Sequence, residues 1–360
     1  MMPSVTARRR HFRDKGYLSS ILLLTLILLG TGLSGPAHAL DPAKSSWRVF
    51  WANDDFLGND NQFTNGISVI ENSALAPSLA ATSGTLAFGK RLAALILPDR
   101  GDLHYRETWS IAQNLQTPDE DGQDEVILDD LPYVGMIGWT NTYTAFNNRE
   151  LTAFQTLIGA VGEITLGEQA QSAAHKISGA NDPDGWENQL DNEPLLNIYA
   201  MKKYKFYDRP RFDASVDVSG GLGNFFSFGQ TGLEFRYGRR PGGFAPFPIP
   251  MGHGIDVDAR LSRPGQTYLY SSLIVRGRAF LFAMPRDGNL LRRNNEWSED
   301  NVLDPRDVIG ELILGFHLER ASWGAHLNFA FTTDTVKNAD DTAVANPKNN
   351  YASLNFEWQF

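Results

Sequence analysis

Apolar and polar residues alternate in short segments along most of this chain. In the last segment, 354–360, large apolar side chains fall on one face and polar ones on the other. The segments 312–318 and 323–331 repeat the pattern. A period of two with large apolar residues on one face is typical of strands that face lipid. The pattern predicts the wall of a membrane barrel, and the chain ends on an aromatic residue, Phe360, as such barrels commonly do.

Nine further segments read as strands, which brings the expected number to about twelve. Bacterial membrane barrels have an even number of strands. The sequence therefore predicts an all-β fold, a transmembrane antiparallel β-barrel of about twelve strands that occupies residues 40–360. The nine further strands are expected at 47–54, 64–72, 105–114, 133–144, 151–162, 195–206, 211–220, 227–237 and 267–281.

The connections should alternate between long external loops and short periplasmic turns. Tight turns are expected at 145–150, 207–211 and 318–322, and long loops at 115–131, 163–194, 282–305 and 333–349. Two long connections, 73–104 and 238–266, break the alternation. Either they are ordered periplasmic segments or a strand is missing from the prediction. Leu92–Leu97 is apolar enough to form a short helix packed under the barrel.

The N-terminus has the three parts of a secretory signal peptide. Arginines at 8–10 form a positive region, 18–29 is apolar, and Ala37-His38-Ala39 is a small-residue cleavage site. We expect residues 1–39 to be removed. An uncleaved membrane anchor is the alternative, but the apolar region is short for one.

Composition narrows the class of protein further. The chain has no cysteine, so no disulfide can stabilise it after export. Its net charge of -10 argues against nucleic acid as a partner and suits divalent cations better. Beyond the signal peptide, no apolar run is long enough for a transmembrane helix.

The long loop 163–194 contains a predicted helix. Leu166–Ile177 lacks proline, has alanines at helical spacing and is followed by Gly179, a residue suited to a helix C-cap. Gln171 and His175 lie four residues apart, on one face of that helix. Histidine is the usual general base near neutral pH, although a single helical histidine is more often structural.

A second polar cluster lies at the expected end of the first strand. Asn53 and Asp54 offer hard oxygen ligands of the kind that calcium prefers. Thr64, at the expected start of the second strand, could add a hydroxyl. The alternative is that these residues only stabilise the turn between the strands.

Three other residues have competing interpretations. Trp186 could be an interfacial aromatic anchor, and Glu193, before Pro194, could simply end a strand ladder. Ser172 could be a nucleophile beside His175, but it lacks the Gly-x-Ser-x-Gly turn that exposes such a serine. Water is therefore the favoured nucleophile.

Taken together, these clusters resemble the outer-membrane lipid A 3'-O-deacylase family. The resemblance is sharpest at 47–72 and 160–206. It implies a twelve-stranded outer-membrane barrel with a short helix in an extracellular loop. It also implies a calcium-dependent esterase that removes the 3'-linked acyloxyacyl chain from lipid A, at a site between the outer wall and that helix. The motifs that carry the resemblance are Asn53-Asp54, Thr64-Asn65-Gly66, Leu166-Gly167-Glu168-Gln169, Gln171, His175, Gly185-Trp186 and Asn192-Glu193-Pro194.

The family's site residues can be placed on this chain one by one. Its Asn-Asp pair corresponds to Asn53 and Asp54, and its hydroxyl residue to Thr64. Its glutamine and catalytic histidine correspond to Gln171 and His175.

The resemblance has two departures. Asn181 stands where a relative has a glutamate. The asparagine side chain offers a carbonyl oxygen to calcium but no negative charge. Asp182 could take the place of the glutamate if the alignment shifts by one residue. The family's basic pair after the third strand is also missing, and acidic residues occupy 119–124.

The resemblance implies a mechanism and partners. Ca²⁺ would bind Asn53, Thr64 and the region of Asn181 and Asp182, while His175 would activate water. Asp54 would either complete the metal site or orient the imidazole of His175, and Gln171 would position water or substrate. The substrate would be lipid A, or lipopolysaccharide, in the outer leaflet of the outer membrane. The oligomeric state is open, and we expect a monomer. The alternatives are a non-enzymatic barrel, such as a small porin, and a phospholipase with a serine nucleophile.

Overall fold

The computed structural model describes most of the chain after the predicted signal peptide. The described residues are 41, 43–57, 63–119, 125–178, 184–246, 249–263, 265–292, 295–320 and 322–359. The predicted signal peptide lies outside them and stays a prediction. In the described part of the chain, no helix is both long and apolar enough to cross a membrane.

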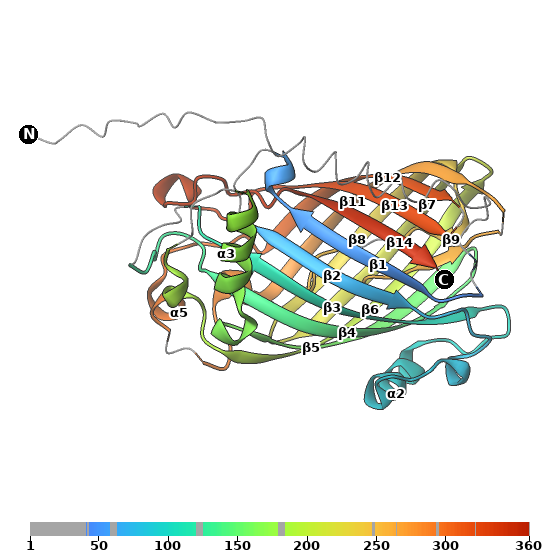
Figure 1. Cartoon of the computed structure of the whole chain (residues 1–360), viewed down its shortest axis with the longest axis horizontal. Helices are drawn as coiled ribbons and strands as arrows, with labels where there is room; N and C mark the ends of the chain where they lie inside the picture. Colours follow the sequence, from blue (N-terminus) through green and yellow to red (C-terminus); the bar gives the residue numbers. More distant parts are fainter. Residues whose placement is uncertain are drawn as a thin grey trace, which may run out of the picture. The chain divides into compact units, whose positions relative to one another are not determined.

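Within the described residues, twelve antiparallel strands close into a barrel (Figure 1). Neighbours in the chain are neighbours in the wall, and the first strand pairs with the last. The predicted fold and number of strands are confirmed. The barrel strands are β1 (Ser46–Asn53), β2 (Asn65–Asn72), β3 (His104–Gln116), β4 (Val134–Phe146), β5 (Glu150–Val161), β6 (Glu193–Arg209), β7 (Phe212–Gly223), β8 (Phe226–Arg239), β11 (Tyr268–Ala283), β12 (Val308–Arg320), β13 (Trp323–Thr332) and β14 (Tyr351–Gln359).

Several strands extend beyond the predicted bounds. β12 starts at Val308 rather than near 312, and β6 ends at Arg209 rather than 206. The backbone ladder continues where side-chain alternation is weak, as at the pair formed by Gly310 and Gly277. Hydrogen bonding between strands, not hydrophobic alternation, decides where a strand ends.

The two faces of the wall follow the predicted alternation. On β12, Leu312, Leu314 and Phe316 are exposed on the outer face, while His317 and Glu319 are buried on the inner face. Apolar side chains outside and polar ones inside are typical of a barrel whose outer surface contacts lipid.

The two rims of the barrel differ. The terminal rim is the end at which β1 begins and β14 finishes. It carries the tight turns 147–149 and 210–211 and the short connection from β12 to β13. The α3 rim is the opposite end, named after the helix α3 (Gly167–Ser178). The short helices of its loops are η1 (Asp55–Leu57), η3 (Glu163–Thr165), η4 (Trp186–Asn188), α4 (Met284–Asp287), α5 (Glu296–Asp300) and η5 (Ala339–Asp341).

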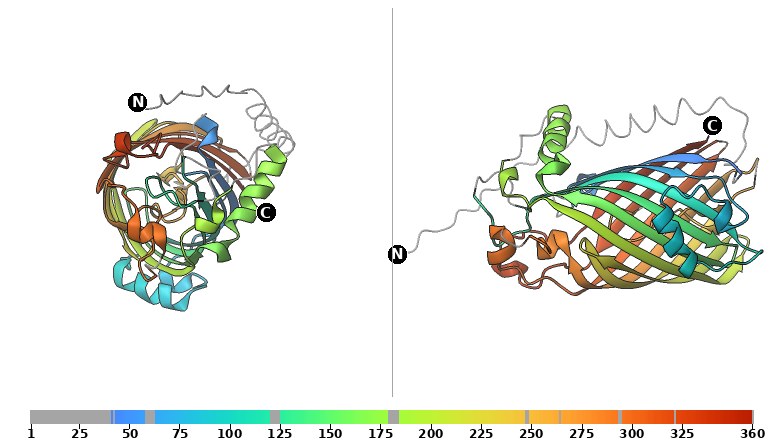
Figure 2. Two further views of the ribbon diagram at one scale, coloured as in Figure 1. Left: turned by 90° about the vertical axis from the view of Figure 1, so that its left-hand side faces the viewer. Right: turned by 90° about the horizontal axis from the view of Figure 1, so that it is seen from below.

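The two long connections that broke the predicted alternation both lie at the terminal rim. The first, 73–103, contains η2 (Leu79–Ala81) and α2 (Ala87–Ile96). A helix packed under the barrel was predicted here, and that position is wrong. α2 contacts β4 and β5 from outside the wall (Figure 2), because Gly89 and Ala93 let its backbone approach the strands.

The second connection, 240–267, enters the barrel. Its ends pair as β9 (Gly242–Phe244) and β10 (Ala259–Leu261). Residues 249–258 between them run through the lumen. Asn114 of β3 donates to the Met251 carbonyl (3.0 Å), and Gln155 of β5 donates to the Gly254 carbonyl (3.4 Å).

Buried ion pairs hold this luminal segment in place. Arg48 pairs with Asp256 (2.8 Å) and Arg106 with Asp258 (3.0 Å). Arg260 of β10 links Asp258 (2.6 Å) to Glu357 of β14 (2.6 Å). Buried charges need such partners, since an unpaired charge costs several kcal/mol. The segment is thus tied to strands that are far apart in the sequence.

Candidate functional site

Helix α3 lies on the outside of the barrel, across the wall at its rim (Figures 1 and 2). Two glycines allow this close approach. A Cβ on Gly135 of β4 would be 3.3 Å from the Gly167 Cα and 2.2 Å from the Thr165 Oγ1. The first turn of α3 therefore rests on the backbone of β4, with no side chain at either glycine to separate them.

The entry to α3 is fixed by local contacts. Thr165 is buried, its hydroxyl donates to the Gly162 carbonyl (2.7 Å), and its carbonyl accepts from Gln113 of β3 (2.8 Å). Leu166 follows with φ 58° and ψ 36°, in the left-handed region. Leucine is strained there, which indicates that surrounding contacts impose this conformation. The predicted helix is confirmed at 167–178, and its predicted C-cap, Gly179, lies outside the described residues.

Gln171 faces the core of the loop. Its side-chain oxygen accepts a hydrogen bond from the indole N–H of Trp186 (2.7 Å), and both side chains are buried. Trp186 also packs against Tyr133, with ring centroids 5.2 Å apart. The interfacial-anchor interpretation of Trp186 is wrong, because the buried indole joins the helix to Tyr133, the residue before β4. That Gln171 positions water or substrate stays a prediction.

Glu193 has a structural role, as one interpretation predicted. Its buried carboxylate accepts from the side chain of Asn224 (2.8 Å) and from the backbone N–H of Leu291 (3.0 Å). It joins two loops of the α3 rim to the start of β6.

The ends of β1, β2 and β3 are bonded to one another. Asn53, the last residue of β1, donates its side-chain N–H to the Thr64 carbonyl (2.7 Å). The Thr64 hydroxyl lies 2.7 Å from that of Thr117. Asp54 follows Asn53 and is 2% exposed. Thr117 was not predicted, because nothing local in the sequence shows that it meets Thr64.

The length of α3 places its last turn near these strand ends. Twelve residues span roughly 18 Å, and neighbouring strands are about 4.8 Å apart, so the helix crosses about three strands. It contacts β4 and β3, and in Figure 1 its other end points toward the ends of β2 and β1. His175 is half-buried in that last turn. Asn181 and Asp182 lie outside the described residues.

The candidate metal ligands at this rim are oxygen atoms. In the described part of the chain, no cluster of three or more histidine, aspartate or glutamate side chains could hold a metal ion. The candidate ligands are therefore oxygen atoms: the buried carboxylate of Asp54, the side-chain amide oxygen of Asn53 and the hydroxyl of Thr64. Calcium prefers hard oxygen ligands of these types.

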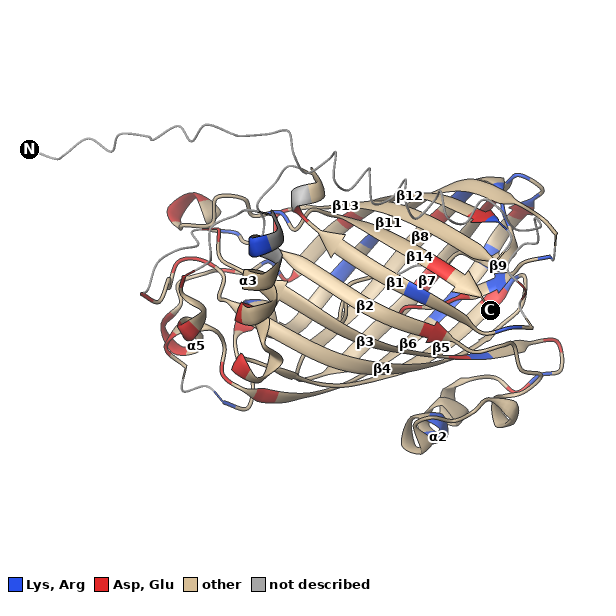
Figure 3. Cartoon of the chain, in the orientation of Figure 1, with Lys and Arg blue, Asp and Glu red and all other residues tan. Residues whose placement is uncertain are grey.

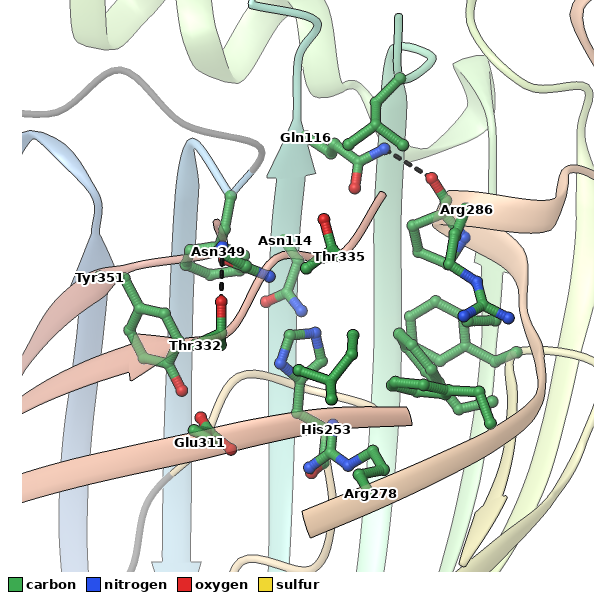
Figure 4. A pocket seen from close by; sticks show the side chains of 18 of the residues that line it. Asn114, Gln116, His253, Arg278, Arg286, Glu311, Thr332, Thr335, Asn349 and Tyr351 are labelled. Atoms are coloured by element: carbon green, nitrogen blue, oxygen red, sulfur yellow. Dashed lines mark hydrogen bonds between the residues drawn. The ribbon is translucent and has the colours of Figure 1, made fainter. Parts of the chain in front are cut away.

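A separate cavity lies inside the barrel (Figure 4). His253 of the luminal segment, Arg278 of β11 and Glu311 of β12 surround it. Arg278 stacks over the Phe228 ring at 4.7 Å. Burial, with Arg278 adding positive charge nearby, lowers the pKa of His253 to about 3. The barrel wall separates this cavity from α3.

The sequence matches the family model described as outer membrane protein LpxR over residues 22–360. The chain belongs to the LpxR family. As an LpxR-family protein it is a transmembrane barrel of the outer membrane, as the residue pattern and the resemblance together predicted. Tight turns of such barrels face the periplasm, so the terminal rim is periplasmic and the α3 rim is extracellular.

Solved structures resemble this LpxR-family barrel. LpxR from Salmonella typhimurium aligns with a TM-score of 0.66 at 16% identity, covering 88% of this chain and 100% of that one. The beta domain of the Bordetella autotransporter BrkA aligns at 0.39, with 8% identity and coverage of 89% and 99%. The NalP translocator domain from Neisseria meningitidis aligns at 0.35, with 8% identity and coverage of 95% and 96%. No curated protein matches the sequence.

Proposed function

We propose that this protein is a lipid A deacylase that hydrolyses the 3'-linked acyloxyacyl ester in the outer leaflet. The observation that carries the proposal is the position of α3 on the lipid-facing side of the wall, with His175 in its last turn. A substrate embedded in the membrane can reach that side by lateral diffusion. Membership of the LpxR family supports the same reaction class.

Apolar side chains surround the base of α3. Ile164 and Leu166 at its start are 67% and 60% exposed, and Ile67 and Ile111 on the nearby strands are also exposed. An apolar surface that continues from the membrane-facing wall to the helix suits an acyl chain. The ester of a bound chain would then lie between the helix and the strand ends.

His175 acts as the general base in this proposal. Its imidazole takes a proton from water, and the water oxygen bonds to the ester carbonyl carbon. The bond between that carbon and the ester oxygen then breaks, and the imidazolium gives its proton to the departing alkoxide oxygen, which becomes the 3'-hydroxyl. The products are a free fatty acid and lipid A with a 3'-hydroxyl group.

Calcium would be held by Asn53, Asp54 and Thr64, with Asn181 and Asp182 as further candidates. When bound, it would supply positive charge that stabilises the oxyanion. The protein's own contribution is to hold the ligands: the hydrogen bond from Asn53 to the Thr64 carbonyl fixes two candidate donors relative to each other.

The α3 rim is acidic (Figure 3). Lipid A carries phosphates, so an acidic rim favours divalent cations between protein and substrate. Acidic residues of the described rim loops include Asp129, Asp130, Glu163, Glu168, Asp184, Glu187, Asp191, Glu296, Glu299 and Asp300.

Mass spectrometry of lipid A tests the proposal. Cells expressing the protein should lose the mass of the 3'-linked acyloxyacyl chain, and His175→Ala should abolish the change. His104→Ala, on the periplasmic rim, is the matched control and should retain activity. Full deacylation by His175→Ala would refute the assignment.

The same assay tests the competing mechanisms. EDTA should stop the reaction and added Ca²⁺ should restore it. Labelling of Ser172 by a covalent serine-hydrolase probe would favour a serine nucleophile instead. Ion conductance in bilayers without any change in lipid A would support a non-enzymatic barrel.

A further inference from the structure

The outer wall near the periplasmic rim carries polar side chains where a barrel normally faces lipid. Arg106 and Gln155 point into the lumen and contact the luminal segment, so their chain neighbours Glu107 and Thr156 point outward. Both outward side chains are nevertheless buried. The segment 73–103 covers them.

The Glu107 carboxylate holds this segment on the wall. It accepts hydrogen bonds from the backbone N–H groups of Gly84 (2.7 Å) and Thr85 (2.8 Å). It also accepts from the Asn141 side chain (2.9 Å) and the Tyr143 hydroxyl (3.1 Å). A carboxylate facing hydrocarbon without such partners would be costly. The segment therefore replaces lipid as the neighbour of the wall at this point.

Helix α2 presents two different faces. Gly89 and Ala93 are buried against the wall, and a Cβ on Gly89 would lie 3.2 Å from the Thr156 Oγ1. The exposed side chains of the helix are apolar except Arg91, which lies opposite Gly89, and the helix contains no acidic residue. Its large exposed apolar side chains are Phe88 (59% exposed), Leu95 (81%) and Ile96 (44%).

The height of α2 on the wall can be worked out along β5. Glu150, at the periplasmic end of β5, pairs with Arg100 and Lys202, and these charges mark the aqueous boundary. Thr156 lies six residues further along the strand, about 20 Å at 3.3 Å per residue. With the usual tilt of about 40°, this is roughly 15 Å along the membrane normal, near the middle of an apolar band about 25 Å tall. Gly89 marks this upper level, and the rest of α2 leads down to Arg100 at the level of Glu150, on the periplasmic side of the band. Ile158, the next outward residue, is exposed.

We propose that α2 is immersed in the periplasmic leaflet of the outer membrane, with Phe88, Leu95 and Ile96 against phospholipid acyl chains. Its apolar face continues the lipid-facing surface formed by Ile158 and its neighbours on the wall. The exposed Arg91 extends from the same helix, and its long stem allows the guanidinium to reach a lipid phosphate. Loss of deacylation would not affect this proposal, which depends only on the covered wall and the helix.

Site-specific fluorescence in proteoliposomes tests the proposal. Because the natural chain has no cysteine, Leu95→Cys provides a single labelling site for an environment-sensitive dye. Gly101→Cys, on the same segment in open space beyond the helix, is the matched control. Heat-dependent mobility in SDS gels verifies that each variant forms a barrel.

Lipids that carry bromine on their acyl chains should quench most of the fluorescence of the dye at position 95, and aqueous iodide should quench little of it. The dye at position 101 should behave in the opposite way. Quenching of position 95 by iodide, equal to that of position 101, would overturn the proposal. Protection of position 95 that disappears on dilution of protein into excess lipid would assign the face to a second copy of the chain, and would also overturn it.

Discussion

The contact between the two glycines gives a sharp test of how α3 is positioned. In Gly135→Ala, the new Cβ would lie 2.2 Å from the Thr165 Oγ1, about 1.2 Å short of an ordinary 3.4 Å contact. Thr165 is buried and hydrogen-bonded, so it cannot rotate freely, and the start of α3 must move away from the wall. A displacement of about 1 Å at a catalytic site can cost roughly 10²-fold in rate, or about 2.7 kcal/mol of activation free energy.

We therefore expect Gly135→Ala to reduce the deacylation rate by about 10–100-fold while the barrel remains folded. The rate is measured by mass spectrometry of purified lipid A in detergent micelles, and folding by thermal unfolding. Gly229→Ala is the matched control, since a Cβ at this strand glycine meets nothing within 4 Å. Thr165→Ala in the Gly135→Ala background removes the clashing hydroxyl and should restore part of the rate. A full rate in Gly135→Ala, with unchanged stability, would refute the argument that this contact positions α3.

Three other predictions concern stability. Arg260→Met leaves the buried carboxylates of Asp258 and Glu357 without a shared partner and should lower the free energy of unfolding, measured by urea titration, by about 3–5 kcal/mol. Arg320→Ala removes an exposed arginine and should change this free energy little. His253 has a lowered pKa in the folded state, about 3, so below pH 6.5 the unfolded state binds a proton that the folded state does not. Stability should thus fall between pH 6.5 and pH 3 by at most about 1.4 kcal/mol per pH unit, and His253→Asn should flatten the slope of the unfolding midpoint against pH. An unchanged slope would show that His253 does not contribute. Leu166→Gly relieves the strain of the left-handed backbone and should raise the free energy of unfolding by about 0.5–1 kcal/mol. The variant also lacks an exposed apolar side chain beside the helix, so its deacylation rate on substrates with long acyl chains should be lower. Lower stability with an unchanged rate would contradict both parts.

The wall of the barrel was predictable because each strand carries its own signal. Leu312, Leu314 and Phe316 show the two-residue period without reference to any other part of the chain. The helix bearing Gln171 and His175 was predictable for a similar reason, since alanine spacing and the absence of proline are local properties. The residues at the end of β1 could be proposed as calcium ligands from their oxygen atoms, but only the family resemblance favoured that role over a turn-stabilising one.

Other features had no local signal. The bond between Gln171 and Trp186 joins a helix to a later loop, and the pair formed by Thr64 and Thr117 joins two different loops. Glycines 135 and 167 matter only because the two backbones meet.

The sequence by itself determined the number and order of the strands, their lipid-facing side and the helix in the long loop. It could do so because periodicity and helix propensity act over a few neighbouring residues. Only the tertiary structure decided that 249–258 fills the lumen and that α2 lies on the outer wall. These placements depend on partners such as Arg48 for Asp256 and Glu107 for Gly84, whose proximity exists only once the barrel has closed.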